Sequence, residues 1–479
     1  MSSSAEDEDW VIKINNEAAR RRDSDVIAEM EQWKKRSIYR IPASFTDVNK
    51  KAYKPQAVSF GPYHHGEEHL KAMEVHKHRA LVRFLRRSGK PLEHYLHALE
   101  PLVQDLKDAY DTTTLPGCSW QQQVEEDHER ISAQFLQLMI LDGCFMLEIL
   151  RTGSGSPKYC LGKDDYAPND PVFSDHGKLY LIPHLRRDML VLQNQLPMLL
   201  LYTLHAVANN VDVVEEEAVE FINDLVIKIW NPNNSDPKKN LGKCLHVLDL
   251  YRKNLLWEPA NKYSRKRQQH VNKRRGAREA ARRRRRNARG GDGDDQIIRS
   301  ATELYEAGIR FKKSKTQSLT DISFRWGVLR LPPITVDDTS ESMFLNLIAF
   351  ERSHVGAGNE VTSYIFFMDN IIDSSKDVSL LHSSGIIQNA IGSDKAVAKL
   401  FNSLSKDITL DPDSSLDVVQ NEVSHYCQKA WNEWRANLIH TYFRSPWAIL
   451  SVIAAIFLFA LTIVQTVYTV LPYYTNSNS

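Results

Sequence analysis

The clearest pattern in this chain is the helical spacing of its apolar residues. Between residues 69 and 88 they recur at steps of three and four, which predicts one stripe along a helix. The stripe consists of Leu70, Met73, Ala80, Leu81, Phe84 and Leu85. Similar spacing continues over 91–110 and 120–151. The run 131–150, ISAQFLQLMILDGCFMLEIL, is apolar on most sides, so we expect it to be the central buried helix.

A further helical segment, residues 184–208, contains Pro197. Proline has no backbone N–H and clashes with the preceding turn, so we expect the helix to kink or split near Gln195. The amide side chains of Gln193, Asn194 and Gln195 can bond the backbone carbonyls that this break leaves free. We therefore predict a structural role for these three residues rather than ligand binding.

One strand-like pattern stands out from the helical background. Residues 319–335 alternate between apolar and polar on both sides of Trp326-Gly327, which predicts a short β-hairpin. Asp337 to Ser340 can then cap the next helix, because their side-chain oxygens accept its free N–H groups. The predicted fold class is therefore mostly α, a large helical domain with a short β-hairpin.

Near its end the chain carries its most apolar segment, Trp447 to Leu471. These 25 residues include no charge and as a helix would span about 37 Å, which is enough to cross a bilayer. The pattern predicts a single transmembrane helix, with a buried core helix and a cleaved lipid-anchor signal as weaker alternatives. The preceding segment, 416–443, has the spacing of an amphipathic stem, and Ser445-Pro446 should interrupt the helix just before the span.

The flanks of this segment predict its direction. Lys429, Arg435 and Arg444 precede it, whereas no basic residue follows it, and basic residues favour the cytosolic side. The acidic N-terminus also lacks the apolar stretch of a signal peptide. We therefore expect the body to be cytosolic and the chain to be tail-anchored. The sequon at Asn233 indicates the opposite topology, but such a triplet arises easily by chance.

Composition adds one contrast. The chain has 479 residues, 42% of them hydrophobic and 25% charged, with a formal net charge of +1. Residues 262–289 alone contain 14 Lys and Arg against one acid, Glu279, so the remainder is acidic. Three interpretations of this basic run remain open: a solvated linker, contact with anionic lipid, or nuclear import and nucleic-acid binding. Because no aromatic residue follows Tyr263 in the run, we expect no sequence-specific nucleic-acid recognition.

The cysteines indicate a reducing environment. They are odd in number, widely spaced and form no C-x-x-C pair, which argues against a disulfide framework or a zinc site. They are Cys118, Cys144, Cys160, Cys244 and Cys427. Cys144 lies in the most apolar helical run, where a cysteine usually serves as a small buried hydrophobe.

Candidate chemistry is sparse. Residues His65, Glu68 and His69 match the H-x-x-E-H pattern that places two imidazoles and a carboxylate around zinc when it lies on a helix. Gly66 puts a turn within the motif, so a polar helix start is the competing interpretation. The sequence contains no phosphate-binding G-x-x-x-x-G-K-[ST] loop and no G-x-S-x-G nucleophile elbow. We therefore assign no catalytic, cofactor-binding or metal-binding residue, and predict a protein that is not an enzyme and needs no cofactor.

These patterns predict six regions. They are a charged leader (1–37), a first helical part (38–257), a basic insertion (258–296), a second part with the helical stem (297–444), the transmembrane helix (447–471) and a short tail (472–479).

Several segments together resemble one plant family, the domain of unknown function 247. They are IYRIPASFTDVNKKAYKPQAVSFGPYHHGEEHLKAMEVHKHRAL, DMLVLQNQLPMLLL, TDISFRWGVLRLPPITVDDTSESMFLNLIAFE and the C-terminal span. The resemblance implies a plant protein with a mostly helical domain, a C-terminal anchor and no established enzymatic activity. Some grass members are proposed as male determinants of self-incompatibility that act with small secreted partners. The resemblance carries over no catalytic residues, and the shared GPYHHG element excludes His69.

The functional expectation is a protein-interaction or recognition module at a membrane, with the plasma membrane as the expected location. Its partners would be lipid, through the C-terminal helix, and an unknown protein, a small secreted one if the body is extracellular. The alternative is a metal-dependent hydrolase built on His65, Glu68 and His69.

Overall fold

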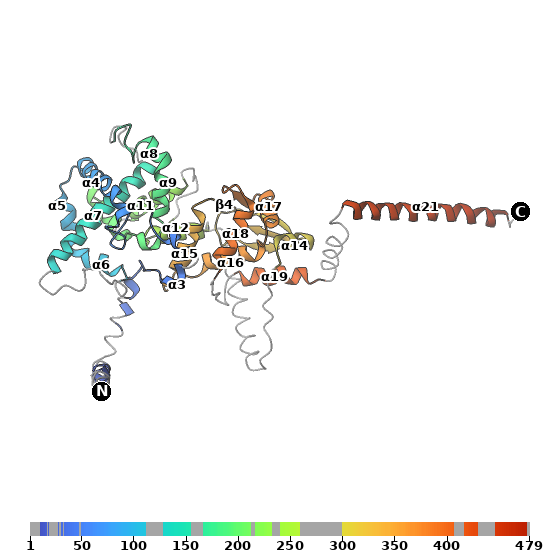
Figure 1. The fold of residues 1–479 in the computed structure, drawn as a ribbon, viewed down its shortest axis with the longest axis horizontal. Helices are drawn as coiled ribbons and strands as arrows, with labels where there is room; N and C mark the ends of the chain where they lie inside the picture. The colour runs from blue at the N-terminus through green and yellow to red at the C-terminus, as the bar shows by residue number, and fades with distance from the viewer. Residues whose placement is uncertain are drawn as a thin grey trace. The chain divides into compact units, whose positions relative to one another are not determined.

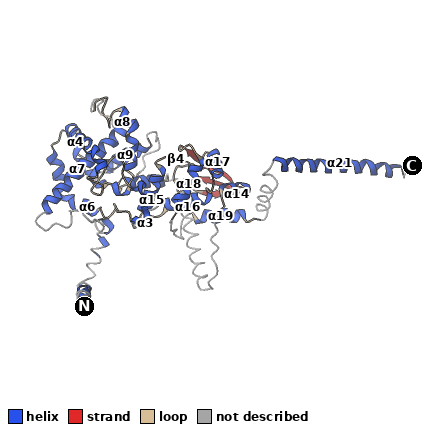
Figure 2. Ribbon diagram, in the orientation of Figure 1, coloured by secondary structure: helices blue, strands red, loops and turns tan. Residues whose placement is uncertain are grey.

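The computed structural model describes residues 10–16, 18, 27, 30–31, 33–46, 49–111, 128–154, 166–211, 216–231, 240–258, 299–406, 416–429 and 446–476. The chain divides into two compact units, one made of residues 1–257 and 337–362, the other of 258–336 and 363–479. Helices dominate both units (Figure 1), and the strands are few and short (Figure 2). The predicted mostly-α fold with a hairpin is thus confirmed.

The first unit consists of helices and 3-10 turns (η). In chain order they are α3 (Ala43–Thr46), η1 (Lys50–Tyr53), η2 (Glu68–Met73), α4 (Glu74–Ser88), α5 (Leu92–Leu99), η3 (Glu100–Leu102), α6 (Val103–Asp108), α7 (His128–Gly153), α8 (Asp175–Tyr180), α9 (Ile182–Asp188), η5 (Leu192–Asn194), α10 (Met198–Asn209), α11 (Glu216–Trp230), α12 (Val247–Leu256) and α15 (Ser340–Ser353). The predicted stripe on η2 and α4 is confirmed in part. Its members Leu70, Met73, Ala80 and Phe84 are buried.

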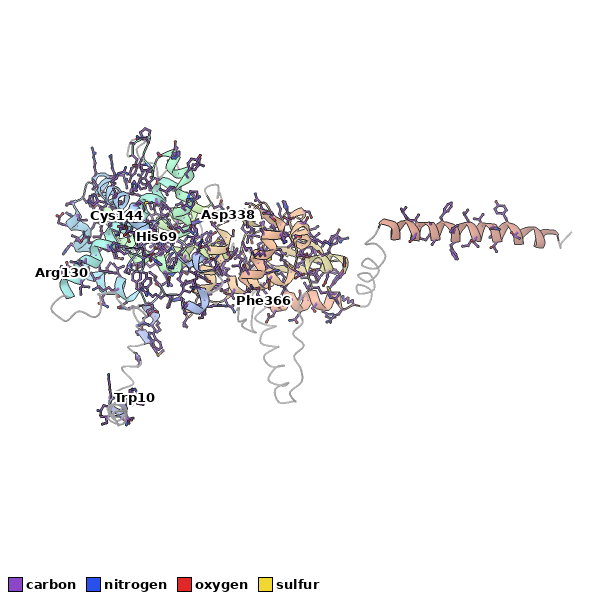
Figure 3. The ribbon with its side chains drawn as sticks, viewed as in Figure 1. Trp10, His69, Arg130, Cys144, Asp338 and Phe366 are labelled. Carbon is purple, nitrogen blue, oxygen red and sulfur yellow. The ribbon has the colours of Figure 1, made fainter. Side chains whose placement is uncertain are left out.

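Helix α7 is the core of this unit, as its apolar run predicts. It packs against α4, α10 and α11, and nearly all of its side chains from 138 to 150 are buried. Cys144 lies on it, inside the helical body (Figure 3), and burial raises the pKa of its thiol well above the usual value. Gly143 permits close packing with α10, since a Cβ there would lie 2.5 Å from a methyl group of Leu204.

The chain splits at Pro197, and the break is wider than one residue. Helix α9 ends at Asp188 and α10 begins after Pro197. The Gln195 amide donates to the carbonyls of Met189 (2.7 Å) and Val191 (2.8 Å). The Asn194 amide donates to those of Val58 and Asp188, both at 3.0 Å. The structural role predicted for these two amides is therefore confirmed.

Helix α12 begins at a buried histidine. Nδ1 of His246 accepts the Asp249 N–H at 3.1 Å, so the proton of the neutral ring lies on Nε2, 3.1 Å from the Ser37 carbonyl oxygen. Both nitrogens are thus used in the neutral form. Burial lowers the pKa of His246 to about 4.

Among the described residues, the second unit contains strands β1 to β5 and several further helices. They are α14 (Ala301–Glu306), β1 (Arg310–Lys313), β2 (Ser323–Arg325), β3 (Val328–Leu331), β4 (Ile334–Val336), α17 (Ser375–Ser383), β5 (Ile387–Asn389), α18 (Asp394–Leu404), α19 (Asp417–Cys427) and α21 (Pro446–Asn476). Helix α16 (Glu360–Ile371) belongs partly to each unit.

The predicted hairpin is confirmed: β2 pairs antiparallel with β3, with Phe324 opposite Leu329. The turn residues Trp326 and Gly327 both have positive φ, 55° and 73°, the backbone pattern of a two-residue type I′ turn. No sequence pattern predicted that β1 pairs parallel with β3, or that β4 pairs parallel with β5.

The side-chain cap predicted for α15 does not form, because no described side chain accepts a free N–H group at the start of this helix. Asp337 instead organises the turn that precedes it. Its Oδ1 accepts the N–H and hydroxyl of Thr339 at 2.9 and 2.8 Å and the Ser340 hydroxyl at 3.0 Å. In turn the Asp337 N–H donates to the Ser340 hydroxyl oxygen at 2.9 Å. These bonds fix the chain as it enters α15.

Helix α21 begins at Pro446, where proline suits the first turn because its missing N–H would have no partner there. It contains the whole predicted span. Its described large apolar side chains are exposed, from 49% for Leu461 and Val467 to 75% for Tyr468. Over the part that can be assessed, only 130–153 of α7 meets the length and hydropathy of a membrane span, and it is 78% buried. The apolar stretch Ile453–Thr469 of α21 is just shorter.

Some predictions fall on parts of the chain outside the described residues. They include parts of the charged leader, residues 120–127 of a predicted helical segment, the sequon at Asn233, Cys118 and Cys160, the basic insertion from 259 to 296, the stem from 430 to 445, and the last three residues of the tail.

Candidate functional site

The H-x-x-E-H motif of the hydrolase alternative does not bring its residues together as a metal site would require. Gly66 has a φ of 85°, so a turn separates His65 from the helical residues that follow. The carboxylate of Glu68 points away to the ammonium group of Lys71. Glu67 instead reaches the histidines, with an oxygen 3.6 Å from Nδ1 of His69. Among the residues that the structure describes, no three His, Cys, Asp or Glu side chains lie close enough together to hold a metal ion.

In this turn it is His64 that lies within hydrogen-bond distance of a carboxylate. Its Nδ1 lies 2.6 Å from Glu67, and its ring is buried. Burial lowers the pKa of His64 despite the nearby carboxylate. The sequence does not predict its burial, because the Gly, Pro and His residues of the GPYHHG element are typical of an exposed turn.

Beside this turn lies a cavity of about 540 Å³, which we call the lysine pocket. Its basic lining consists of Lys50, Lys51, Lys54 and His69, the last labelled in Figure 3. Its other lining residues are Thr46, Tyr53, Pro55, Gln56 and Gln193. Of the residues assigned to the hydrolase alternative, His69 alone lines this pocket.

A buried carboxylate holds the backbone of the loop that carries the lysines. Asp188 accepts the backbone N–H groups of Gln56 (2.9 Å), Ala57 (2.6 Å) and Val58 (3.1 Å). Burial raises the pKa of Asp188, and these donors together with Arg187 oppose the shift. Three consecutive amides bound by one carboxylate fix the backbone just after Pro55.

Side chains from two other elements complete the scaffold. The Arg187 guanidinium donates to the carbonyl oxygens of Lys51 (2.7 Å) and Lys54 (3.2 Å). From α15, the Ser342 hydroxyl and the Asn346 amide donate to the Ala52 carbonyl oxygen at 2.6 and 2.9 Å. The backbone of η1 is therefore fixed, and its lysine side chains remain exposed.

The pocket is electrostatically one-sided. Lys50, Lys51 and Lys54 are exposed, and within the described ranges none of them forms an ion pair with a carboxylate. No Asp or Glu is among the described residues that line the cavity. Three unneutralised ammonium groups around hydroxyl and amide groups favour a carboxylate- or phosphate-bearing ligand.

Other buried charges in the unit are structural. Lys77 and Asp142 are both fully buried, with Nζ 2.7 Å from Oδ1. Arg87 and Arg151 both pair with buried Glu148. Burial alone would raise the pKa of Glu148, but its two arginines lower it on balance. These charges tie α7 to α4, and their place on apolar helical faces gave no sequence indication of pairing.

The fold and the pocket together define the class of this protein. It is a mostly helical protein of two units, with a basic pocket and an exposed apolar C-terminal helix. The chain matches the family model for DUF247, plant proteins of unknown function, over residues 38–461, and it belongs to this family. It is 31% identical to the UPF0481 protein At3g47200 of Arabidopsis thaliana over 446 residues, which cover 91% of this chain and 86% of that protein.

A second relative is similar over a shorter region. It is the UPF0481 protein At3g02645 of Arabidopsis thaliana, 30% identical over 174 residues, which cover 36% of this chain and 33% of that protein. No solved structure matches the chain.

Proposed function

We propose that this chain is a non-enzymatic plant membrane protein that α21 anchors through a single span and whose body recognises a protein partner. The observation that carries the anchor is the exposure of four successive apolar side chains, Ile456 to Phe459, each between 62% and 70% exposed. Successive residues lie 100° apart around a helix, so these four cover nearly all of its circumference. A helix that is apolar on all sides is stable only in a buried or lipid environment.

The orientation follows from the charges that flank α21. Three basic residues lie within 18 residues before it, and the tail beyond it has none. This asymmetry favours a cytosolic body at the plasma membrane. With the opposite topology the body would meet small secreted partners, as proposed for some grass members in self-incompatibility.

The lysine pocket supports recognition of an acidic partner segment. Its three ammonium groups attract anions, and the rigid backbone beneath them gives their stems a fixed starting point. A loop or terminus with two or three Asp or Glu residues fits a cavity of about 540 Å³ by charge. Attachment to a membrane would raise the effective concentration of this pocket toward other membrane-bound proteins.

The hydrolase alternative has less support. It needs His65, Glu68 and His69 at one point, and the turn at Gly66 and the ion pair of Glu68 keep them apart. A scaffold of backbone bonds around a basic cavity suits binding better than turnover. Sequence-specific nucleic-acid binding likewise stays outside the proposal.

Proximity labelling of the full-length protein in plant cells would test recognition through the pocket. The test variant carries Lys50→Glu, Lys51→Glu and Lys54→Glu. The matched control carries the same charge changes at exposed positions on α17 and α18: Lys376→Glu, Lys395→Glu and Lys399→Glu. We expect labelling of specific partners to fall about tenfold or more in the pocket variant and to persist in the control.

An unchanged set of partners in the pocket variant would contradict the proposal. Equal membrane content and equal helical circular dichroism of the two variants must accompany the comparison, so that misfolding does not imitate loss of binding.

A further inference from the structure

The three-stranded sheet of the second unit has one strongly basic face. In the register of β1, β3 and β2, Arg310 lies opposite Val328, which lies opposite Arg325. Lys312 likewise lies opposite Arg330. Residues directly opposite each other on paired strands share a face of the sheet. Four of the six positions on this face are therefore cationic, and the other two, Val328 and Ser323, are uncharged.

The opposite face is mostly apolar, with Phe311 beside Leu329 and Phe324, and its one charged residue, Lys313, lies at the end of β1 opposite Leu331. The two faces therefore have different roles. Phe311 and Leu329 are buried. Arg310, Lys312 and Arg325 on the basic face are exposed. The sheet thus packs its apolar face into the unit and leaves the basic face to solvent.

Charges of opposite sign are usually interspersed on a protein surface, where they can neutralise one another. Among the described residues, neither these three cations nor Arg330 forms an ion pair. The contact of Arg310 is with an aromatic ring, its guanidinium carbon 4.5 Å from the centre of Tyr305. The face therefore keeps its positive potential.

A second, independent observation comes from the tip of the hairpin. Trp326 is 88% exposed, and its φ of 55° lies in the left-handed region, which bulky L-residues avoid. Asparagine or glycine would fit this turn position with less strain. A tryptophan here contributes neither turn stability nor core burial, and its exposed ring is available to contact a partner surface.

Protection of strand edges explains only part of this arrangement. Lysine and arginine on the edge strands β1 and β2 would discourage pairing with another chain. Arg330, however, lies on the central strand, where no edge needs protection. An exposed Trp326 would increase association rather than prevent it.

We propose that this basic face, defined by Arg310, Lys312, Arg325 and Arg330 with Trp326 at its rim, docks on a membrane surface of anionic lipid. Basic side chains are attracted to anionic headgroups, and an indole ring prefers the headgroup region. Each Lys or Arg near such a surface strengthens contact about fivefold, so four give on the order of several hundredfold before salt screening. The proposal rests on the membrane anchorage proposed above.

A short stretch of chain connects the sheet to α21. The ring of Tyr426, on α19, packs against Phe324 at 5.4 Å between centres, and its hydroxyl lies beside Gly327. Pro446, the first residue of α21, follows Tyr426 by only twenty positions. A chain of this length spans at most about 70 Å. An anchored α21 would therefore hold the hairpin within reach of the bilayer surface.

The test uses the full-length protein in nanodiscs made of neutral lipid or of lipid with about 30% phosphatidylserine. Acyl chains carry bromine, which quenches nearby tryptophan, and the emission difference between the natural protein and Trp326→Phe isolates Trp326. The charge variant carries Arg310→Glu, Lys312→Glu and Arg325→Glu. Its control carries Lys376→Glu, Lys395→Glu and Lys399→Glu.

We expect Trp326 to be quenched in anionic nanodiscs only. The quenching should disappear in the charge variant and persist in the control, and it should weaken as salt rises from about 0.05 to about 0.5 M. Equal emission of Trp326 in neutral and anionic discs would overturn the proposal, as would quenching that survives in the charge variant. If added polyglutamate or duplex DNA protected Trp326 from quenching by the brominated lipid, the proposal would also be overturned, in favour of a protein or nucleic-acid partner. Failure of anchorage is distinguishable, because the protein would then not co-purify with the discs.

Discussion

The buried pair of Lys77 and Asp142 allows the sharpest test of the helical core. Nζ of Lys77 lies 2.7 Å from Asp142 and 2.7 Å from Glu74, and the second oxygen of Asp142 accepts the Gly61 N–H at 2.8 Å. Lys77→Met removes the cation and leaves a fully buried carboxylate. Breaking one side of a buried ion pair costs about 3–5 kcal/mol.

Proton uptake would limit this loss. Burial already raises the pKa of Asp142 while Lys77 is present, and without the cation this pKa rises further. Stability of the Lys77→Met variant should therefore improve as pH falls, because the neutral acid is the form that burial favours. Adding Asp142→Asn should restore stability to within about 1 kcal/mol of the natural protein, since the amide oxygen still accepts the Gly61 N–H.

Hydrogen exchange of α4 and α7 amides in the full-length protein measures these differences as local opening free energies. The matched control is Lys178→Met, which breaks an ion pair to the fully exposed Asp175 and should cost at most about 0.5 kcal/mol. A loss below about 1 kcal/mol in Lys77→Met would refute the reasoning. So would a double variant that is less stable than the single one.

Three further predictions concern single residues. His246→Asn keeps a capping side chain for α12 but removes a group whose pKa is about 4 in the folded protein. As pH falls from about 6.5 to 4, the natural protein should lose about 3 kcal/mol of its free energy of unfolding, and the variant should not lose this contribution. Hydrogen exchange of the α12 amides measures the difference. Trp326→Asn relieves left-handed strain and should raise hairpin protection by about 1 kcal/mol, whereas equal or lower protection would count against that strain. Gly61→Ala, whose Cβ would lie 2.7 Å from the Tyr110 hydroxyl, should cost about 1–3 kcal/mol, visible as a lower melting temperature; an unchanged melting temperature would contradict the tight turn.

Local patterns predicted the local elements. The three- and four-residue spacing located α4 and α7, and the alternation around Trp326-Gly327 located the hairpin, because each signal depends on residues a few positions apart. Pro197 predicted the break between α9 and α10 for the same reason. The parallel pairing of β1 with β3 gave no signal, since such short strands are specified by their partners rather than by their own sequence.

The candidate site was less predictable than the fold. The spacing of His65, Glu68 and His69 suggested a metal site only if a helix ran through all three, and the left-handed conformation of Gly66 prevents this. The lysine pocket depends on Asp188, which lies 130 to 132 positions from the residues whose N–H groups it accepts. Such pairing across the chain follows from tertiary packing, which no local pattern encodes.

Extraction with alkaline carbonate tests anchorage by α21 most directly. Full-length protein should remain in the membrane pellet, and Leu458→Arg with Leu461→Arg should release it, because each arginine at a span centre costs about 2.5–3.5 kcal/mol. The matched control places arginine at two exposed apolar positions of the leader, Val11→Arg and Ile14→Arg, and should stay in the pellet. Release of the natural protein into the supernatant, or retention of the Leu458→Arg and Leu461→Arg variant, would contradict the account.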